Sequence, residues 1–308
     1  MKKNNPFICD PVTGVCGDTE DSGMEMIDLT SPKKTIDLYY VTDPICSHCW
    51  ALEPVLGRFM NQYGHYFNVH TVMGGLLEKW GEGPVDPANG IYGPADVAGH
   101  WREVGEHARM PIDGSLMVHD PVQSSYPPSR VYKVIQQHHG NETADTFLRR
   151  AREDLFAFNQ NISDRTVLTD VVNEVGLNGE SILKEADEEK SQDLLNEDFA
   201  LAGSLGARGF PTIIMVNEEK QGVKIVGSRS FDFYVEGLKQ VMGKENLEPS
   251  KPSSLSNLLD DNKLLFSKEI EVMYELEQEN VKEFIKKELA AGTFEVKEIL
   301  GESYVVKK

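Results

Sequence analysis

The chain has 308 residues, and its 50 acidic and 31 basic side chains give a formal net charge of −19 at pH 7. Phosphate backbones and anionic membrane surfaces both need a basic binding face, so this balance argues against nucleic acid and membrane as partners. Apolar residues make up 40 % of the chain and charged residues 26 %, as in ordinary globular proteins, and no apolar run approaches the roughly 20 residues that span a bilayer.

Residues 1–34 are predicted to form a flexible tail, because they are polar and rich in glycine and proline. They contain no apolar stretch followed by a cleavage site, so they are not read as a signal peptide, and we expect a cytoplasmic protein. Thiols stay reduced in that compartment, so structural disulfides are not expected. Cys9 and Cys16 are only weak candidates for metal ligands, since their spacing matches no regular zinc motif.

The next part of the chain has the order strand, cysteine motif, helix, strand. Residues 35–42 are β-branched and aromatic over the length of a strand, and residues 67–73 repeat that pattern. Between them, apolar residues recur at steps of three and four over 47–64, which predicts a helix. Pro54, five residues after Cys49, is expected to kink this helix.

Cys46-Ser47-His48-Cys49 is the most informative motif of the sequence. The strand-to-helix junction places Cys46 at a helix N-terminus, where free N–H groups and the helix dipole favour a thiolate. His48, either as a cation or as a hydrogen-bond donor, would stabilise the thiolate further. Cys46 is therefore predicted to be the more acidic and more accessible thiol, with Cys49 as the resolving thiol. Half of a zinc site, which would need further ligands, and plain core cysteines are the alternatives.

A large helical insertion is predicted at about residues 81–206, where strand signals are nearly absent. Strand patterns return at 212–216 and 223–226, followed by a helix over 231–242. This order matches the second half of a thioredoxin fold, so the sheet is expected to be interrupted by the insertion.

A second candidate feature is the segment Phe210-Pro211-Thr212, directly before the returning strand. A proline at the start of a central strand often follows a cis bond and leaves one backbone edge free. We expect a cis-proline loop that faces the cysteine motif. An ordinary loop proline is the alternative.

The C-terminal part is predicted to be a separate module over residues 255–308, joined by a linker at 246–254. Short helices over 255–266, 268–276 and 281–291 precede a hairpin around Gly301, an order typical of a winged-helix-like domain. Its eight basic residues stand against twelve acidic ones, so DNA binding is not expected.

The cysteine motif with Trp50, the segment Ser125-Tyr-Pro-Pro-Ser129 and the proline loop resemble the DsbA family of thioredoxin-fold proteins. The resemblance implies an α/β, thioredoxin-like (DsbA-type) domain over 35–245 with a large helical insertion, plus the small winged-helix-like module. The whole chain resembles a cytosolic branch of that family, adapters that present the transcription factor Spx to the ClpXP protease. In that branch the C-x-x-C need not be catalytic, and no cofactor is implied. Relatives often carry a His- and Cys-rich tail, whereas this tail has Cys9 and Cys16 and no histidine before His48.

Two functions follow from these observations. The intact motif favours a thiol–disulfide oxidoreductase, with Cys46 as nucleophile and Cys49 as resolving thiol. The resemblance over the whole chain favours the adapter, because a general oxidoreductase has no need of residues 255–308, and the adapter is our expectation. A glutathione-dependent isomerase is a weaker third possibility, since such enzymes usually lack the second cysteine.

Overall fold

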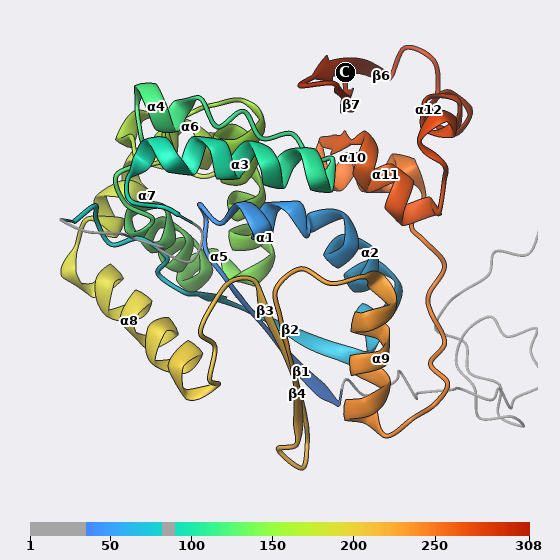
Figure 1. Cartoon of the computed structure of the whole chain (residues 1–308), viewed down its shortest axis with the longest axis horizontal. Coiled ribbons are helices and arrows are strands. Elements are labelled where there is room, and N and C mark those ends of the chain that lie inside the picture. Colours follow the sequence, from blue (N-terminus) through green and yellow to red (C-terminus); the bar gives the residue numbers. More distant parts are fainter. Residues whose placement is uncertain (1–34, 82–89) are drawn as a thin grey trace, which may run out of the picture. The chain divides into compact units, whose positions relative to one another are not determined.

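The computed structural model describes residues 35–81 and 90–308 (Figure 1). The predicted tail, with Cys9 and Cys16, lies outside the described residues. Four strands form one mixed sheet in the order β2-β1-β3-β4. They are β1 (Ile36–Thr42), β2 (Phe67–Met73), β3 (Thr212–Asn217) and β4 (Gly222–Val226). β1 pairs parallel with β2 and antiparallel with β3, which is antiparallel to β4, so the sheet has the strand pairing of a thioredoxin fold.

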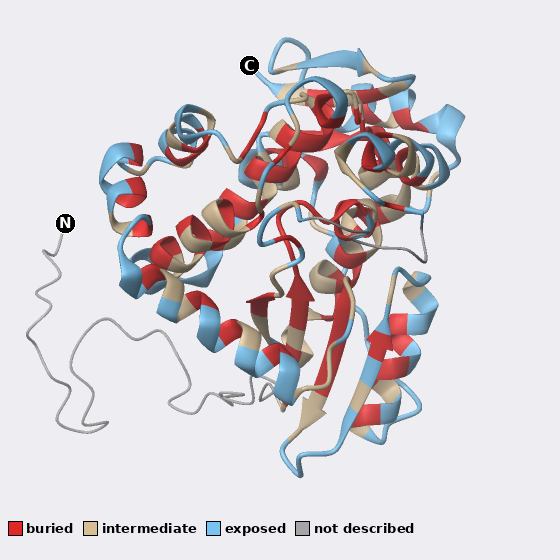
Figure 2. Ribbon diagram, turned by 60° about the vertical axis from the view of Figure 1, so that its left-hand side comes forward, coloured by how far each residue is buried: buried red, intermediate tan, exposed pale blue. Residues whose placement is uncertain are grey.

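Helices cover both faces of this sheet, because alternate residues of a strand point to opposite faces. On one face, Leu38 and Tyr40 pack against α2 (Glu53–Tyr63) and α9 (Phe231–Met242). On the other face, Val41 and its neighbours pack near α8 (Glu189–Ser204). Figure 2 shows buried residues along the central strands of this sheet, in agreement with the largely buried β1 and β3.

The predicted helix after the cysteine motif is divided in two, as the position of Pro54 suggested. The short α1 (Ser47–Ala51) ends at Leu52, and α2 starts at Glu53 with the proline in its first turn. A proline there costs no hydrogen bond, because the first turn of a helix has no acceptor for its N–H groups. The break at Leu52 leaves the cysteine motif on its own single-turn helix.

The large helical insertion is present, and its apolar faces form the largest core cluster around Trp50 and Phe156. Its helices are α3 (Pro94–Ala108), α4 (Leu116–His119), α5 (Tyr126–Arg152), α6 (Arg165–Glu174), α7 (Gly179–Ala186) and α8. α5 is kinked at Gly140, whose φ of 84° is non-helical, and it runs into a π-helical turn (Glu153–Ala157). Among the described residues, none of the helices combines the length and the apolar character needed to cross a membrane.

The C-terminal segment contains three helices and a three-stranded sheet of order β5-β7-β6. Its elements are α10 (Leu255–Asn262), β5 (Leu264–Phe266), α11 (Ser267–Tyr274), a 3₁₀ turn (Gln278–Asn280), α12 (Val281–Glu288), β6 (Phe294–Ile299) and β7 (Glu302–Lys307). The helix predicted over 255–266 is wrong at its end, because Lys263 adopts a left-handed φ of 59° and the chain continues as a strand. The winged-helix-like character of this segment stays a prediction.

Residues 255–308, the C-terminal module from here on, pack directly on the thioredoxin domain, and Figure 1 shows α11 beside α2. The module has a small core of its own, but its Leu264 and Phe266 belong to the core of the insertion. The residues before it follow α2, where the Ser250 amide donates to the Gln62 carbonyl at 2.7 Å. The module is thus anchored to the helix that follows the cysteine motif.

Candidate functional site

The two cysteines of the motif lie at the start of α1 and differ in depth. Cys46 is the N-cap residue, 5 % exposed, and its Sγ accepts a hydrogen bond from the Cys49 amide at 3.2 Å. Cys49 lies one turn into the helix and is fully buried. Both are free thiols in the described structure. Only Cys46 lines the adjoining cleft, so the predicted order of accessibility fits this geometry.

The acidity of the two thiols depends on more than the helix terminus. Burial raises the pKa of the Cys46 thiol, and the hydrogen bond that this thiol gives to Cys49 raises it further. Burial also opposes ionisation of Cys49, but that hydrogen bond, the Arg152 guanidinium and the Thr42 hydroxyl together lower the pKa of Cys49. The helix N-terminus alone therefore does not decide which sulfur ionises, because burial and Arg152 act on both thiols.

Of the two roles expected for His48, cation or hydrogen-bond donor, its surroundings disfavour the cation. Its ring contacts the ring of His100 from α3, with the two centroids 5.3 Å apart in an edge-on arrangement. Partial desolvation and the neighbouring His100 lower the pKa of His48, so the neutral imidazole is favoured near neutral pH. A neutral His48 contributes no positive charge to either thiol.

The proline loop begins at a cleft beside the motif, with Arg208, Gly209 and Phe210 in the cleft wall. The Phe210–Pro211 peptide is cis, the Pro211 carbonyl accepts from the Gly227 amide at 2.8 Å, and the Thr212 hydroxyl donates to the Gly209 carbonyl. The cleft has a volume of about 510 Å³. Its walls come from the motif, the proline loop and the insertion: Ile45, Cys46, Ser47, His48, Leu76, Leu77, Trp80, Ile91, Val97, His100, Trp101, Met117, Arg208, Gly209 and Phe210.

A buried arginine, which the sequence analysis did not single out, lies next to the thiols. Arg152, at the end of α5, is 1 % exposed and donates to the Thr42 hydroxyl and, at 3.1 Å, to the Asp43 carbonyl. Its Nη1 pairs with Glu53 Oε1 at 2.7 Å. Three arginines within four residues are an unusual pattern in so acidic a chain, but spacing alone does not show that one of them points inward.

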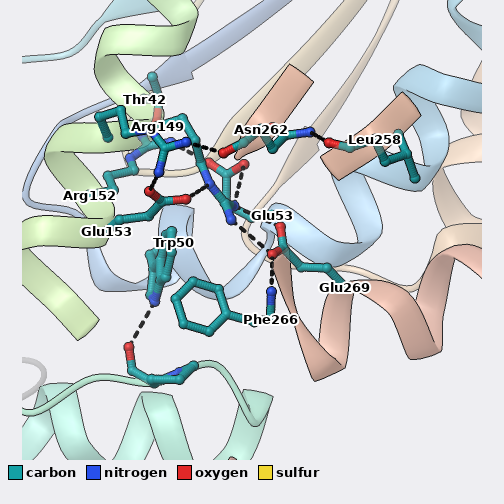
Figure 3. A network of polar contacts seen from close by, with 12 residues as sticks. Thr42, Trp50, Glu53, Arg149, Arg152, Glu153, Leu258, Asn262, Phe266 and Glu269 are labelled. Atoms are coloured by element: carbon teal, nitrogen blue, oxygen red, sulfur yellow. Dashed lines mark hydrogen bonds and ion pairs between the residues drawn. The ribbon is translucent and has the colours of Figure 1, made fainter. Parts of the chain in front are cut away.

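Arg152 is part of a larger polar network, shown in Figure 3. Arg149 bonds Glu269 of the C-terminal module through both of its terminal nitrogens, at 2.7 and 2.8 Å, and Glu153 at 2.7 Å. Arg150 pairs with Glu153 and donates to the Asn262 carbonyl. Burial raises the pKa of Glu153 to about 7 despite these arginines. The network connects the motif, the insertion and the module.

Alkylation of the reduced chain tests the arrangement of the two thiols. Iodoacetamide is expected to modify Cys46 before Cys49, because only Cys46 borders the cleft, and to react slowly below pH 8, because burial raises the pKa of that thiol. Mass spectrometry of tryptic peptides over a series of pH values measures both rates. Faster labelling of Cys49, or a Cys46 rate that is already maximal at pH 6, would contradict this geometry.

Asp43 fixes the turn that leads into the motif. Its carboxylate accepts hydrogen bonds from the Ile45 amide at 3.0 Å, the Leu76 amide at 2.7 Å and the Ser125 hydroxyl at 2.9 Å. Burial outweighs these bonds and raises the pKa of Asp43 from 3.8 to about 6. The carboxyl thus joins the motif to the start of α5.

The raised pKa of Asp43 predicts how its contribution to stability changes with pH. A carboxyl whose pKa is higher in the folded chain stabilises most at low pH, and this contribution is lost as the pH rises through about 6. Between about pH 4 and 7 the wild type is expected to lose about 2–3 kcal/mol relative to Asp43→Asn. Urea unfolding of both proteins across this range measures the difference, and parallel pH profiles would contradict the prediction.

The family model described as thioredoxin matches residues 39–236, well over half of the chain. Eight curated relatives match the chain, and all are named ClpXP adapter protein SpxH. The relative from Halalkalibacterium halodurans is 28 % identical and covers 92 % of this chain and 91 % of its own length. The relative from Bacillus subtilis is also 28 % identical, with 83 % of this chain and 84 % of its own length covered.

Two solved structures share the fold of the described sheet and insertion. A putative protein disulfide isomerase from Nitrosomonas europaea has a TM-score of 0.55 at 18 % identity, over 68 % of this chain and 96 % of its own. The cytosolic disulfide reductase DsbM from Pseudomonas aeruginosa has a TM-score of 0.52 at 22 % identity, over 67 % of this chain and 98 % of its own. At such identities the likeness concerns the fold alone.

Proposed function

We propose that this chain, which belongs to the thioredoxin family, is a cytoplasmic adapter. It would bind the transcription factor Spx and promote its degradation by the ClpXP protease. The observation that carries the proposal is the extent of the match with the curated adapters. A match over 92 % of the chain leaves fewer residues unmatched than the C-terminal module contains, so it includes part of that module. The disulfide isomerase and reductase structures cover only about two thirds of the chain.

The chemistry of the thiols supports an adapter more than a catalyst. A thiol–disulfide oxidoreductase needs a nucleophilic thiolate that its substrate can reach. Here Cys46, which borders the cleft, is itself buried and has a raised pKa, and Cys49, whose pKa is lowered, is fully buried. The cleft and the cis-proline loop suit an oxidoreductase, so thiol–disulfide exchange remains the second candidate function.

Direct binding tests the proposal. Purified Spx and the full chain, mixed at micromolar concentration, are expected to elute together in gel filtration, with the thiols of this chain reduced and also with both cysteines replaced by alanine. A broad protein–protein interface does not depend on two small buried side chains. Separate elution of two folded proteins under all of these conditions would contradict the adapter function.

A further inference from the structure

We propose that Arg152 holds the Cys46–Cys49 pair in its reduced form, and that ion pairs leading from Arg152 make the packing of the C-terminal module depend on the redox state of that pair. The proposal goes beyond the adapter function and does not rest on it. It concerns the described residues around the motif, α2, α5 and α11.

The first step is the position of Arg152 beside the sulfurs. Its guanidinium interacts electrostatically with both Cys46 and Cys49, and its Nη2 bonds the Thr42 hydroxyl, which in turn hydrogen-bonds Cys49. Its Nε is buried without a hydrogen-bond partner, so this cation is incompletely satisfied. A buried cation of this kind favours negative charge on a neighbouring sulfur, because the low dielectric of the interior strengthens their attraction.

The second step is the sharing of one carboxylate by two arginines. Glu53, at the start of α2, places Oε1 2.7 Å from Arg152 and Oε2 3.8 Å from Nη1 of Arg149. It is therefore bonded closely to Arg152 and only loosely to Arg149. A change in the charge next to Arg152 therefore changes how strongly Glu53 binds Arg152 and how strongly it binds Arg149.

The third step connects Arg149 to the C-terminal module. Arg149 holds Glu269 through two hydrogen bonds, and Glu269 Oε2 accepts from the Phe266 amide at 2.9 Å at the start of α11. A second path is aromatic, because Trp50 follows Cys49 and its ring meets Phe266 edge-on, with the centroids 5.4 Å apart. Figure 3 shows Trp50, Phe266, Arg149 and Glu269 gathered at this junction.

Oxidation would remove from this arrangement the Cys49 sulfur that Arg152 favours in its anionic form. The Cys46 sulfur attacks a low-molecular-weight disulfide such as oxidised glutathione and releases one thiolate. The Cys49 sulfur then displaces the second, which leaves the Cys46–Cys49 disulfide. Two electrons pass to the small disulfide. When Cys49 is ionised, the one proton of the pair goes to one of the two released thiolates, and the negative charge of the Cys49 sulfur leaves with the other. Because the disulfide is neutral, Glu53 becomes the main anion for Arg152, its loose contact with Arg149 is lost, and the Arg149–Glu269 junction is rearranged.

Hydrogen exchange of the full wild-type chain, reduced or oxidised with glutathione disulfide, tests this coupling. Amides of β5 and α11 are expected to exchange roughly tenfold faster in the oxidised chain, while those of α7, outside the network, stay unchanged. The difference in exchange between the oxidised and reduced chains should disappear in Glu269→Gln, because the Arg149–Glu269 contact is then weakened in both redox states. It should also disappear in Cys46→Ser/Cys49→Ser, which cannot form the disulfide. Equal exchange in both states, failure of the disulfide to form, or a difference that persists in Glu269→Gln would overturn the proposal.

The role of Arg152 is tested by the equilibrium of the full chain with glutathione. Arg152→Gln is expected to shift that equilibrium about tenfold toward the disulfide, which corresponds to about 30 mV in reduction potential. Arg152→Lys, which keeps the positive charge, is expected to bring the equilibrium most of the way back to the wild-type value. Arg165→Gln, which removes an arginine from an exposed ion pair with Asp187, serves as the matched control and should leave the equilibrium unchanged. An unchanged equilibrium in folded Arg152→Gln would contradict this part of the proposal. If that variant does not fold, hydrogen exchange of the wild-type chain still tests whether the redox state of the cysteines changes the packing of the C-terminal module.

Discussion

Replacing Phe266 with alanine is expected to lower the free energy of unfolding of the whole chain by about 3–5 kcal/mol, the usual cost of removing a buried aromatic ring. Phe266 lies in the C-terminal module and is fully buried, yet it packs in the core of the insertion against Trp50 and beneath Arg149. Its loss leaves a cavity between the module and the residue that follows Cys49. Thermal unfolding followed by circular dichroism should show a midpoint lower by at least about 6 °C.

Phe233→Ala provides the matched control for this experiment. Phe233 is on α9 and 53 % exposed, so its removal is expected to change the free energy of unfolding by no more than about 0.5 kcal/mol. If Phe266→Ala were as stable as this control, the module would be independent of the thioredoxin domain. The packing described for the chain would then be wrong.

Replacing both Cys46 and Cys49 with alanine is expected to abolish any insulin-reducing activity of the chain, because exchange requires a nucleophilic and a resolving thiol. Stimulated degradation of Spx by ClpXP is expected to remain largely intact, since an adapter acts through a broad surface. Insulin turbidity and the Spx half-life, measured on one preparation, compare the two activities. A melting curve close to that of the wild type establishes that the variant is folded.

Pro211→Ala is the companion variant, because it alters the loop opposite the motif and keeps both thiols. It is expected to reduce any reductase activity in part and to leave Spx degradation unchanged. If the folded double-alanine variant lost the stimulation of Spx degradation, the dithiol would be required for delivery. The function would then be redox-dependent.

The thioredoxin part of the fold was predictable from the sequence, because its signals are local. The strand patterns before the motif and after Pro211 identify the strands, and the position of Pro54 indicates the helix break. The short strand β5 was missed, since three residues carry too little pattern to be distinguished from the end of a helix. The helical pattern of the sequence continues past Asn262, but residues 264–266 form a strand because they pair with β7.

The acidity of the thiols could not be predicted for a different reason. The argument from the helix terminus considers one element, whereas the pKa of each cysteine depends on burial and on Arg152, which is about 100 residues away in sequence. The same holds for the contact between Arg149 and Glu269, which joins parts of the chain 120 residues apart. Long-range charge pairs leave no periodic pattern.

The adapter function is tested most directly by the half-life of purified Spx in the presence of ClpX, ClpP and ATP, with and without the full chain. We expect degradation to become severalfold faster with stoichiometric chain, and to return to the basal rate when excess Spx that lacks a degradation signal competes for binding. An unchanged half-life, with the chain folded and ClpXP active on an unrelated substrate, would contradict the adapter function.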